Sequence, residues 1–120
     1  MSLKLQPGLR VFVYGEAIDM RAGFTKLQGL VTEGMKGNLF EGSLFLFLGK
    51  NRRRAKVLVF DGTGLILIIK RLDRGHFMPV TDFFETGEIA IGELERILDG
   101  VNLRVIYAAQ KAKRDSKEVA

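Results

Sequence analysis

The sequence predicts an α+β fold, with a mainly antiparallel sheet, a central hairpin and about two packed helices. Three apolar runs of strand length follow one another in the middle of the chain, and a strong turn signal separates the second from the third. Apolar residues recur at helical spacing before and after these runs. No internal repeat is visible in the 120 residues, so we expect a single α+β domain over 1–110 and a charged C-terminal tail over 111–120 that frays.

The central strands are predicted at Leu44–Leu48, Val57–Phe60 and Leu65–Ile69. Between the last two, Asp61-Gly62 predicts a hairpin, because both residue types tolerate the positive φ angles of tight primed turns. Runs that are apolar on both faces need cover on both faces, and a chain this short has few helices. A second copy or another protein is therefore a candidate cover for one face of the sheet.

The segments before the hairpin predict one more strand and one helix. Arg10–Tyr14 alternates polar and apolar residues, which is typical of a half-buried strand. Met20–Met35 carries an apolar stripe at helical spacing, and Asp19 is a good candidate for its N-cap.

The segments after the hairpin predict short strands and a second helix. Phe83–Phe84 and Glu88–Ile91 have strand character on either side of a turn. Gly92–Asp99 places its leucines and isoleucine on one side of a helix, and Gly100 is suited to end it.

Composition limits the class of protein. A net charge of +5 and a pI near 9.7 are compatible with a polyanionic partner. The absence of cysteine excludes disulfides, thiolate metal sites and a cysteine nucleophile. No apolar run is long enough to span a bilayer and the N-terminus has no signal-peptide core, so we expect a soluble, cytoplasmic protein without a membrane partner.

The most informative feature is a cluster of basic residues around the predicted hairpin. Eight of the 19 basic residues fall within 25 positions, namely Lys50, Arg52, Arg53, Arg54, Lys56, Lys70, Arg71 and Arg74. If Phe60 opposes Leu65, antiparallel pairing places Arg54 opposite Arg71; a register shifted by two residues matches Arg53 with Lys70 instead. Either register gathers the charges at the end of the hairpin away from Asp61-Gly62.

Two interpretations of this basic cluster remain open. Arginine forks and lysine point charges could contact nucleic-acid phosphates with little sequence specificity. Alternatively, the cluster could be a solvated sheet edge, where lysine and arginine block edge-to-edge aggregation. Base-specific recognition has no signature in the sequence, because it lacks a helix-turn-helix pattern and a zinc finger.

Catalytic chemistry has little support. Carboxylates could hold metal ions for phosphoryl transfer, and the candidates are Asp19, Asp61, Asp73, Asp82 and Glu85. No spacing among them specifies a metal site, and each has a plainer role at a cap, a turn or a strand end. His76 is the only histidine and has no nucleophile partner motif. We therefore expect no catalytic residues, no metal and no cofactor.

An ordered set of motifs runs from about Leu5 to Leu103. The motifs are Asp19-Met20-Arg21-Ala22-Gly23-Phe24, Gly42-Ser43-Leu44-Phe45-Leu46-Phe47, Arg52-Arg53-Arg54-Ala55-Lys56-Val57-Leu58, Asp61-Gly62-Thr63-Gly64 and Lys70-Arg71-Leu72-Asp73-Arg74-Gly75-His76-Phe77. Together they resemble the accessory protein encoded by the second reading frame of the insertion sequence sixty-six family of bacterial transposons. That family commonly has Trp near the positions of Phe60 and Met78, whereas this chain has no Trp, which indicates a diverged or orphaned copy.

The resemblance implies a role in transposition beside a separate transposase that carries the catalytic carboxylates. It implies DNA, the transposase and other transposition proteins as partners, and a second copy of the chain is a further candidate. Three hypotheses follow: a DNA-phosphate contact through the basic hairpin, an adaptor that docks on the transposase through an apolar sheet face, and a metal-dependent nuclease. The first is preferred, because both basic clusters are predicted to meet at one end of the hairpin, and the nuclease is the least favoured, because no spacing of carboxylates specifies a metal site.

Overall fold

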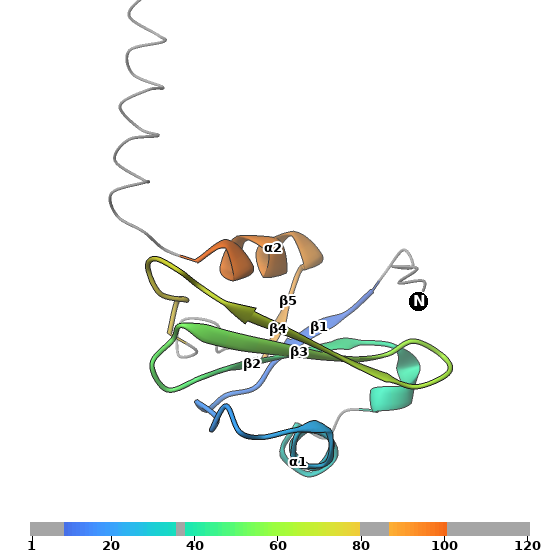
Figure 1. Ribbon diagram of the computed structural model, residues 1–120. Helices are drawn as coiled ribbons and strands as arrows, with labels where there is room; N and C mark the ends of the chain where they lie inside the picture. Colours follow the sequence, from blue (N-terminus) through green and yellow to red (C-terminus); the bar gives the residue numbers. More distant parts are fainter. Residues whose placement is uncertain (1–8, 36–37, 80–86, 101–120) are drawn as a thin grey trace, which may run out of the picture.

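A five-stranded sheet with helices on both faces forms the described part of the computed structural model, residues 9–35, 38–79 and 87–100 (Figure 1). The strands are β1 (Val11–Val13), β2 (Leu44–Leu48), β3 (Arg54–Phe60), β4 (Leu65–Arg71) and β5 (Glu88–Ile89), in the spatial order β4-β3-β2-β1-β5. The helical segments are α1 (Phe24–Gly29), the π-helical turn η1 (Leu30–Gly34), the 3₁₀ turn η2 (Leu39–Glu41) and α2 (Ile91–Asp99). The predicted α+β class, mainly antiparallel around a central hairpin, is confirmed.

One strand pair departs from the antiparallel pattern. β1 runs parallel to β2, with Phe12 beside Phe45 and their rings stacked at 5.6 Å between centroids. Parallel neighbours need a long crossover connection, and α1, η1 and η2 lie within it. The remaining pairs, β1–β5, β2–β3 and β3–β4, are antiparallel.

The first helix begins four residues later than its apolar stripe predicts. α1 starts at Phe24 with Gly23 at the N-cap and no side-chain cap, so the assignment of Asp19 as the N-cap is wrong. The Asp19 carboxylate instead accepts a hydrogen bond from the Arg21 backbone N–H at 2.9 Å and pairs with the Arg21 guanidinium at 2.7 Å. These local bonds compete with the helix and hold a turn ahead of it.

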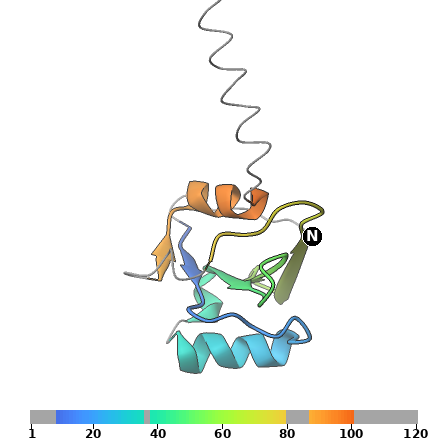
Figure 2. The ribbon, with the colours of Figure 1, turned by 90° about the vertical axis from the view of Figure 1, so that its left-hand side faces the viewer.

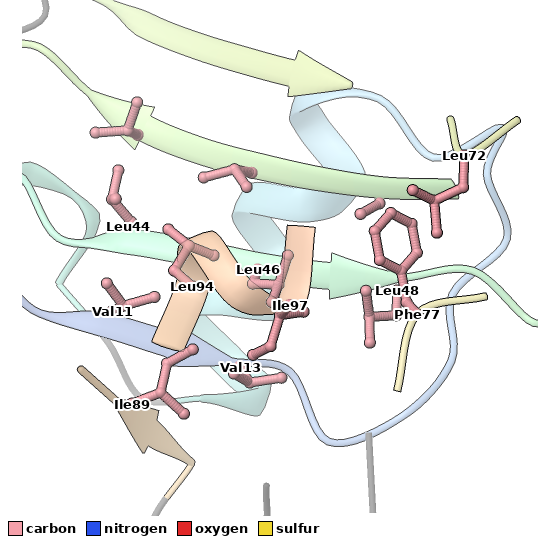
Figure 3. Close-up of a cluster of buried hydrophobic side chains, with 13 residues drawn as sticks. Val11, Val13, Leu44, Leu46, Leu48, Leu72, Phe77, Ile89, Leu94 and Ile97 are labelled. Carbon is pink, nitrogen blue, oxygen red and sulfur yellow. The ribbon is translucent and has the colours of Figure 1, made fainter. Parts of the chain in front are cut away.

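Side chains of the sheet build two cores, one against α2 and one against α1. Alternate residues of a strand point to opposite faces, so β2 contributes to both. The α2-side core, drawn in Figure 3, contains Val11, Val13, Leu44, Leu46, Leu48, Ala55, Val57, Val59, Leu72, Phe77, Ile89, Leu94 and Ile97. The α1-side core contains Ile18, Leu27, Val31, Leu39, Phe45, Phe47 and Leu58. The chain thus covers both faces of β2 and β3 itself, whereas Ile68 and Ile69 of β4 remain exposed.

The hairpin adopts the first of the two predicted registers. Phe60 opposes Leu65 and Arg54 opposes Arg71. At the turn, Gly62 has a φ of 99°, the left-handed region that favours glycine. Asp61 contributes through its carboxylate, which accepts hydrogen bonds at 2.9 Å from the backbone N–H of Thr63 and of Gly64. These bonds and one from the Thr63 hydroxyl lower the pKa of Asp61.

The C-terminal elements follow the prediction closely. Glu88 and Ile89 form a strand, whereas Ile91 already belongs to α2. Gly100 ends α2 with a φ of 76° and donates its N–H to the Ile97 carbonyl at 3.0 Å. The predicted strand Phe83–Phe84 and the tail 111–120 lie outside the described residues. Among those that are described, no helix has the length and apolar content to cross a membrane.

Replacing Leu58 with alanine should lower the free energy of unfolding by about 2–5 kcal/mol, because Leu58 is 0% exposed in the α1-side core and the change leaves a cavity. Urea unfolding followed by far-UV circular dichroism measures the decrease. Ile91→Ala, at a position 40% exposed, is the control and should cost about 1 kcal/mol or less. Equal decreases in the two variants would contradict the assignment of Leu58 to a core.

Candidate nucleic-acid interface

Three segments meet at the end of the hairpin away from Asp61. They are the β2–β3 loop, the first residue of β3, and the chain that leaves β4. The Leu72 N–H donates to the Arg53 carbonyl at 2.8 Å, and the Phe77 N–H donates to the Arg52 carbonyl at 2.6 Å. We call this region the basic end, and its residues are Lys50, Arg52, Arg53, Arg54, Lys70, Arg71 and Arg74. The sequence prediction that the two basic clusters meet here is confirmed by the register.

Two buried side chains hold the segment after β4 in place. Leu72 and Phe77 both lie in the α2-side core, near Leu48 (Figure 3). The α2 terminus packs directly behind them, since a Cβ on Gly100 would lie only 2.6 Å from a Leu72 methyl carbon. Arg71 and Arg74 on either side of Leu72 are exposed. Core packing thus presents these two arginines to solvent.

The β2–β3 loop is tight and carries three further basic residues. The Gly49 N–H donates to the Arg54 carbonyl at 2.9 Å, and the Arg52 N–H donates to the Gly49 carbonyl at 3.0 Å. Arg52 has a φ of 57°, the one positive φ of a non-glycine residue in the described chain. A side chain in this region costs of order 1 kcal/mol or more, and such strain is often found at functional sites.

Arginines dominate the basic end. Arg54 and Arg71 are direct cross-strand partners on the α1 side of the sheet, and like charges so placed destabilise a sheet. With Arg53 they line a cavity of about 300 Å³, whose other lining residues are Asn51, Leu72 and Asp73. The ion pairs among the described residues are Arg10–Glu88 and Arg21–Asp19, so none of the seven basic side chains forms a salt bridge with a described carboxylate.

Two acidic residues border this surface. Asp73 lines the arginine cavity, as its position in the sequence suggests. Asp19 was not expected here; it lines a neighbouring cavity of about 290 Å³ with Lys50 and Arg54. The bridge between Ile18 and Gly49 brings it there, a long-range pairing that no local pattern signals. Hydrogen bonds from Arg21 hold the pKa of Asp19 well below its usual range, and the charge of Lys50 adds to this.

Lys56 is the one predicted contact residue that the structure does not bring to this surface. It is 6% exposed, and its ammonium donates to the carbonyls of Met20 and Ala22, both at 2.7 Å. A buried ammonium that donates two hydrogen bonds to backbone carbonyls is a structural element. Lys56 therefore ties the turn before α1 to the sheet, and the candidate interface consists of the seven residues of the basic end.

The acidic candidates for catalysis do not gather. Asp61 serves the hairpin turn and Asp19 pairs with Arg21. Asp82 and Glu85 lie outside the described residues. In the portions of the chain that the structure covers, no three His, Asp or Glu side chains lie close enough to hold a metal ion.

Fold and surface define a small α+β protein with arginines concentrated at one end of a hairpin. The chain belongs to the family described as IS66 Orf2 like protein, which matches residues 9–108. This family is one of transposition accessory proteins of insertion sequences. The family expected from the ordered motifs of the sequence is thereby confirmed.

Two relatives come from Sinorhizobium fredii (strain NBRC 101917 / NGR234). Uncharacterized protein y4hO is 41% identical over 98 residues, which cover 80% of this chain and 84% of the relative. Uncharacterized protein y4jC is 35% identical over 77 residues, which cover 62% of this chain and 66% of the relative. No solved structure matches the chain.

Replacing Lys56 with methionine should lower the free energy of unfolding by about 1–3 kcal/mol, because the carbonyls of Met20 and Ala22 are left without their donor. Urea unfolding measures this decrease. Amide hydrogen exchange of Ala22, whose N–H donates to the Asp19 carbonyl, should also become faster. The control is Lys26→Met at an exposed position of α1, expected to change stability by no more than about 0.5 kcal/mol. Unchanged stability and exchange in the Lys56 variant would refute the tethering role.

Proposed function

We propose that the chain is a non-catalytic accessory protein of DNA transposition that binds DNA phosphates through its basic end. One observation carries the proposal: seven basic side chains, with Arg54 directly opposite Arg71, gather at one end of the hairpin, and none of them forms a salt bridge with a described carboxylate.

Electrostatics favours an anion at this place. Packing fixes Arg54 and Arg71 on adjacent strands, so their repulsion cannot be relieved by moving the backbone. A phosphate that lies between them accepts hydrogen bonds from both guanidinium groups and replaces the repulsion by attraction. Each neutralised phosphate also releases condensed counterions, which adds a salt-dependent free energy to binding.

The proposed contacts carry little sequence information. Phosphates are the same in every DNA sequence, so contacts to them position a protein without specifying bases. Side chains such as Arg52, Arg53 and Arg74 enlarge the positive surface around the central pair. Low sequence specificity suits an accessory component that acts beside a separate transposase, which carries the catalytic carboxylates.

The adaptor hypothesis receives less support from the fold. An apolar docking face was expected from strands that are apolar on both sides, but α1 and α2 cover both sides of β2 and β3. The nuclease hypothesis gains no support from the described carboxylates, which form no cluster of three.

The double variant Arg54→Gln/Arg71→Gln should bind duplex DNA at least tenfold more weakly than the wild-type chain, because it removes the cross-strand pair. Fluorescence anisotropy with a labelled duplex of about 30 base pairs, titrated between about 50 and 200 mM salt, measures this. The slope of log K against log salt should become shallower by about 0.9 for each phosphate that the variant no longer neutralises.

The matched control is Lys26→Gln/Arg96→Gln, which lowers the net charge by the same two units but at exposed positions on α1 and α2. It should retain most of the affinity. Equal weakening in the two double variants would show that net charge alone governs binding. A wild-type chain that binds no duplex at about 50 mM salt would refute the proposal.

A further inference from the structure

The two edges of the sheet differ greatly. β5, at one margin, has two residues, whereas β4, at the other, has seven (Figure 2). Proteins commonly protect a sheet edge by keeping it short or by placing a proline, a bulge or charges on it. β4 contains no proline, pairs with β3 without a bulge, and reads Leu65-Ile66-Leu67-Ile68-Ile69 before its first charge at Lys70. Most of its length is therefore an unprotected edge.

Hydrogen bonds at both ends of the β3–β4 ladder show which backbone groups of β4 point outward. The Leu72 N–H donates to the Arg53 carbonyl, and the Asp61 N–H donates to the Gly64 carbonyl. In an antiparallel pair the hydrogen-bonded positions alternate, so the even-numbered residues of β4 bond to β3. The residues whose N–H and C=O point away from the sheet are then Leu65, Leu67, Ile69 and Arg71, and no described strand lies beyond them.

Side chains on this edge are apolar and incompletely covered. Ile68, on the α2 side, is 42% exposed, and Ile69, on the α1 side, is 59% exposed. Neither α1 nor α2 covers them, because both helices lie over the middle strands (Figure 2). An additional strand beside β4 would cover both isoleucines, one on each face.

We propose that β4 pairs antiparallel with β4 of a second copy, across a two-fold axis at Ile68, to make one continuous sheet through the dimer. In this register Leu65 opposes Arg71, Ile66 opposes Lys70, Leu67 opposes Ile69, and Ile68 opposes itself. All seven residues are paired, and the four outward-facing residues of each copy meet one another in about eight backbone hydrogen bonds. The outward-facing backbone groups of β4 in one copy thus match those of β4 in the other copy.

Charge selects this arrangement over its alternative. A parallel pairing in register would place Lys70 and Arg71 against their own copies, and like charges so placed are destabilising. The antiparallel pairing places Arg71 of each copy opposite Leu65 of the other copy. Leu65 directly follows the hairpin turn that contains Asp61, so each Arg71 lies near the acidic turn of the other copy. At about 3.4 Å per residue, the two Arg71 positions then lie about 20 Å apart along the strands. Attraction toward the acidic turn and separation of the basic ends both favour a second copy as the occupant.

Sedimentation equilibrium of the 120-residue chain tests the dimer. The expected mass is twice the 13.4 kDa of the chain. Ile69→Lys should raise the dissociation constant at least tenfold, because the exposed position tolerates lysine in the monomer but not against Leu67 of a second copy. The matched control, Ile91→Lys, makes the same change at a position 40% exposed on α2 and should leave the dimer intact.

The variant Ile68→Cys tests the register of the dimer. This test remains valid even where Ile69→Lys does not fold. The chain has no cysteine of its own. At a non-hydrogen-bonded antiparallel pair the Cα atoms lie about 4.5 Å apart, within the range of a disulfide. Ile68→Cys should form a covalent dimer under mild oxidation, while Ile91→Cys should not.

Three results would overturn the proposal. One is a wild-type chain that stays monomeric at about 100 μM, which would indicate that a strand of another protein, and not a second copy, pairs with β4. The others are a dimer that Ile91→Lys dissociates while Ile69→Lys does not, and a dimer that Ile68→Cys fails to cross-link. DNA binding is not needed for any of these measurements, so the dimer and the proposed phosphate contact stand or fall separately.

Discussion

The architecture depends on the burial of β2 and β3 on both faces. Every residue of β2 is buried, with leucines turned toward α2 and phenylalanines toward α1. A strand of this kind is stable only between two covering layers, because each exposed face would cost about 25 cal/mol for every Å² of apolar surface left in water. The crossover that carries α1 supplies one layer, and α2 with the segment after β4 supplies the other. The placement of α1 and α2 on opposite faces of the sheet meets this requirement.

The same constraint builds the basic end. Leu72 and Phe77 enter the α2-side core, and their backbone N–H groups bond to the β2–β3 loop. Burial of these two side chains therefore stabilises a surface on which cross-strand repulsion between Arg54 and Arg71 is unfavourable. A site for an anion that forms before the anion binds is expected to hold like charges close together, and core packing must offset their repulsion. The binding free energy of the anion is then not needed to assemble the site.

Lys56 illustrates how one charge in a basic run can have a different role from its neighbours. It lies two residues from Arg54 on the same side of β3, yet α1 and the turn before it cover this position. Its ammonium then finds two backbone carbonyls in place of solvent. The helical layer on the α1 side covers Lys56 but ends before Arg54. Lys56 is therefore a structural tether, and the other seven basic side chains lie at the basic end.

The two proposals are compatible in space. The β4 edge runs along the side of the hairpin, whereas the basic end lies at the end of the hairpin away from its turn. The two surfaces share Lys70 and Arg71, whose side chains stand on the faces of the sheet and are not consumed by backbone pairing at its edge. A dimer formed through β4 would present two basic ends on one assembly, and two linked binding sites raise the effective concentration of each for the same duplex. Such an assembly would bind DNA more tightly than a single chain without any new type of interaction.

The sequence by itself determined the α+β class, the three central strands, the hairpin and the second helix, and it limited the hairpin to two registers, of which the structure selects one. These follow from local signals: apolar runs of strand length, Asp61-Gly62 at the turn, and Gly100 at the helix end. Of the eight basic residues that the sequence predicted to cluster, seven lie at the basic end, because antiparallel pairing converts sequence position into spatial position once the turn is known. Tertiary structure alone decided the parallel pairing of β1 with β2, the late start of α1, the approach of Asp19 to Lys50, and the burial of Lys56. Each of these depends on contacts between residues 30 or more positions apart, or on a local hydrogen bond that competes with the helix, and neither kind of interaction leaves a periodic trace in the sequence.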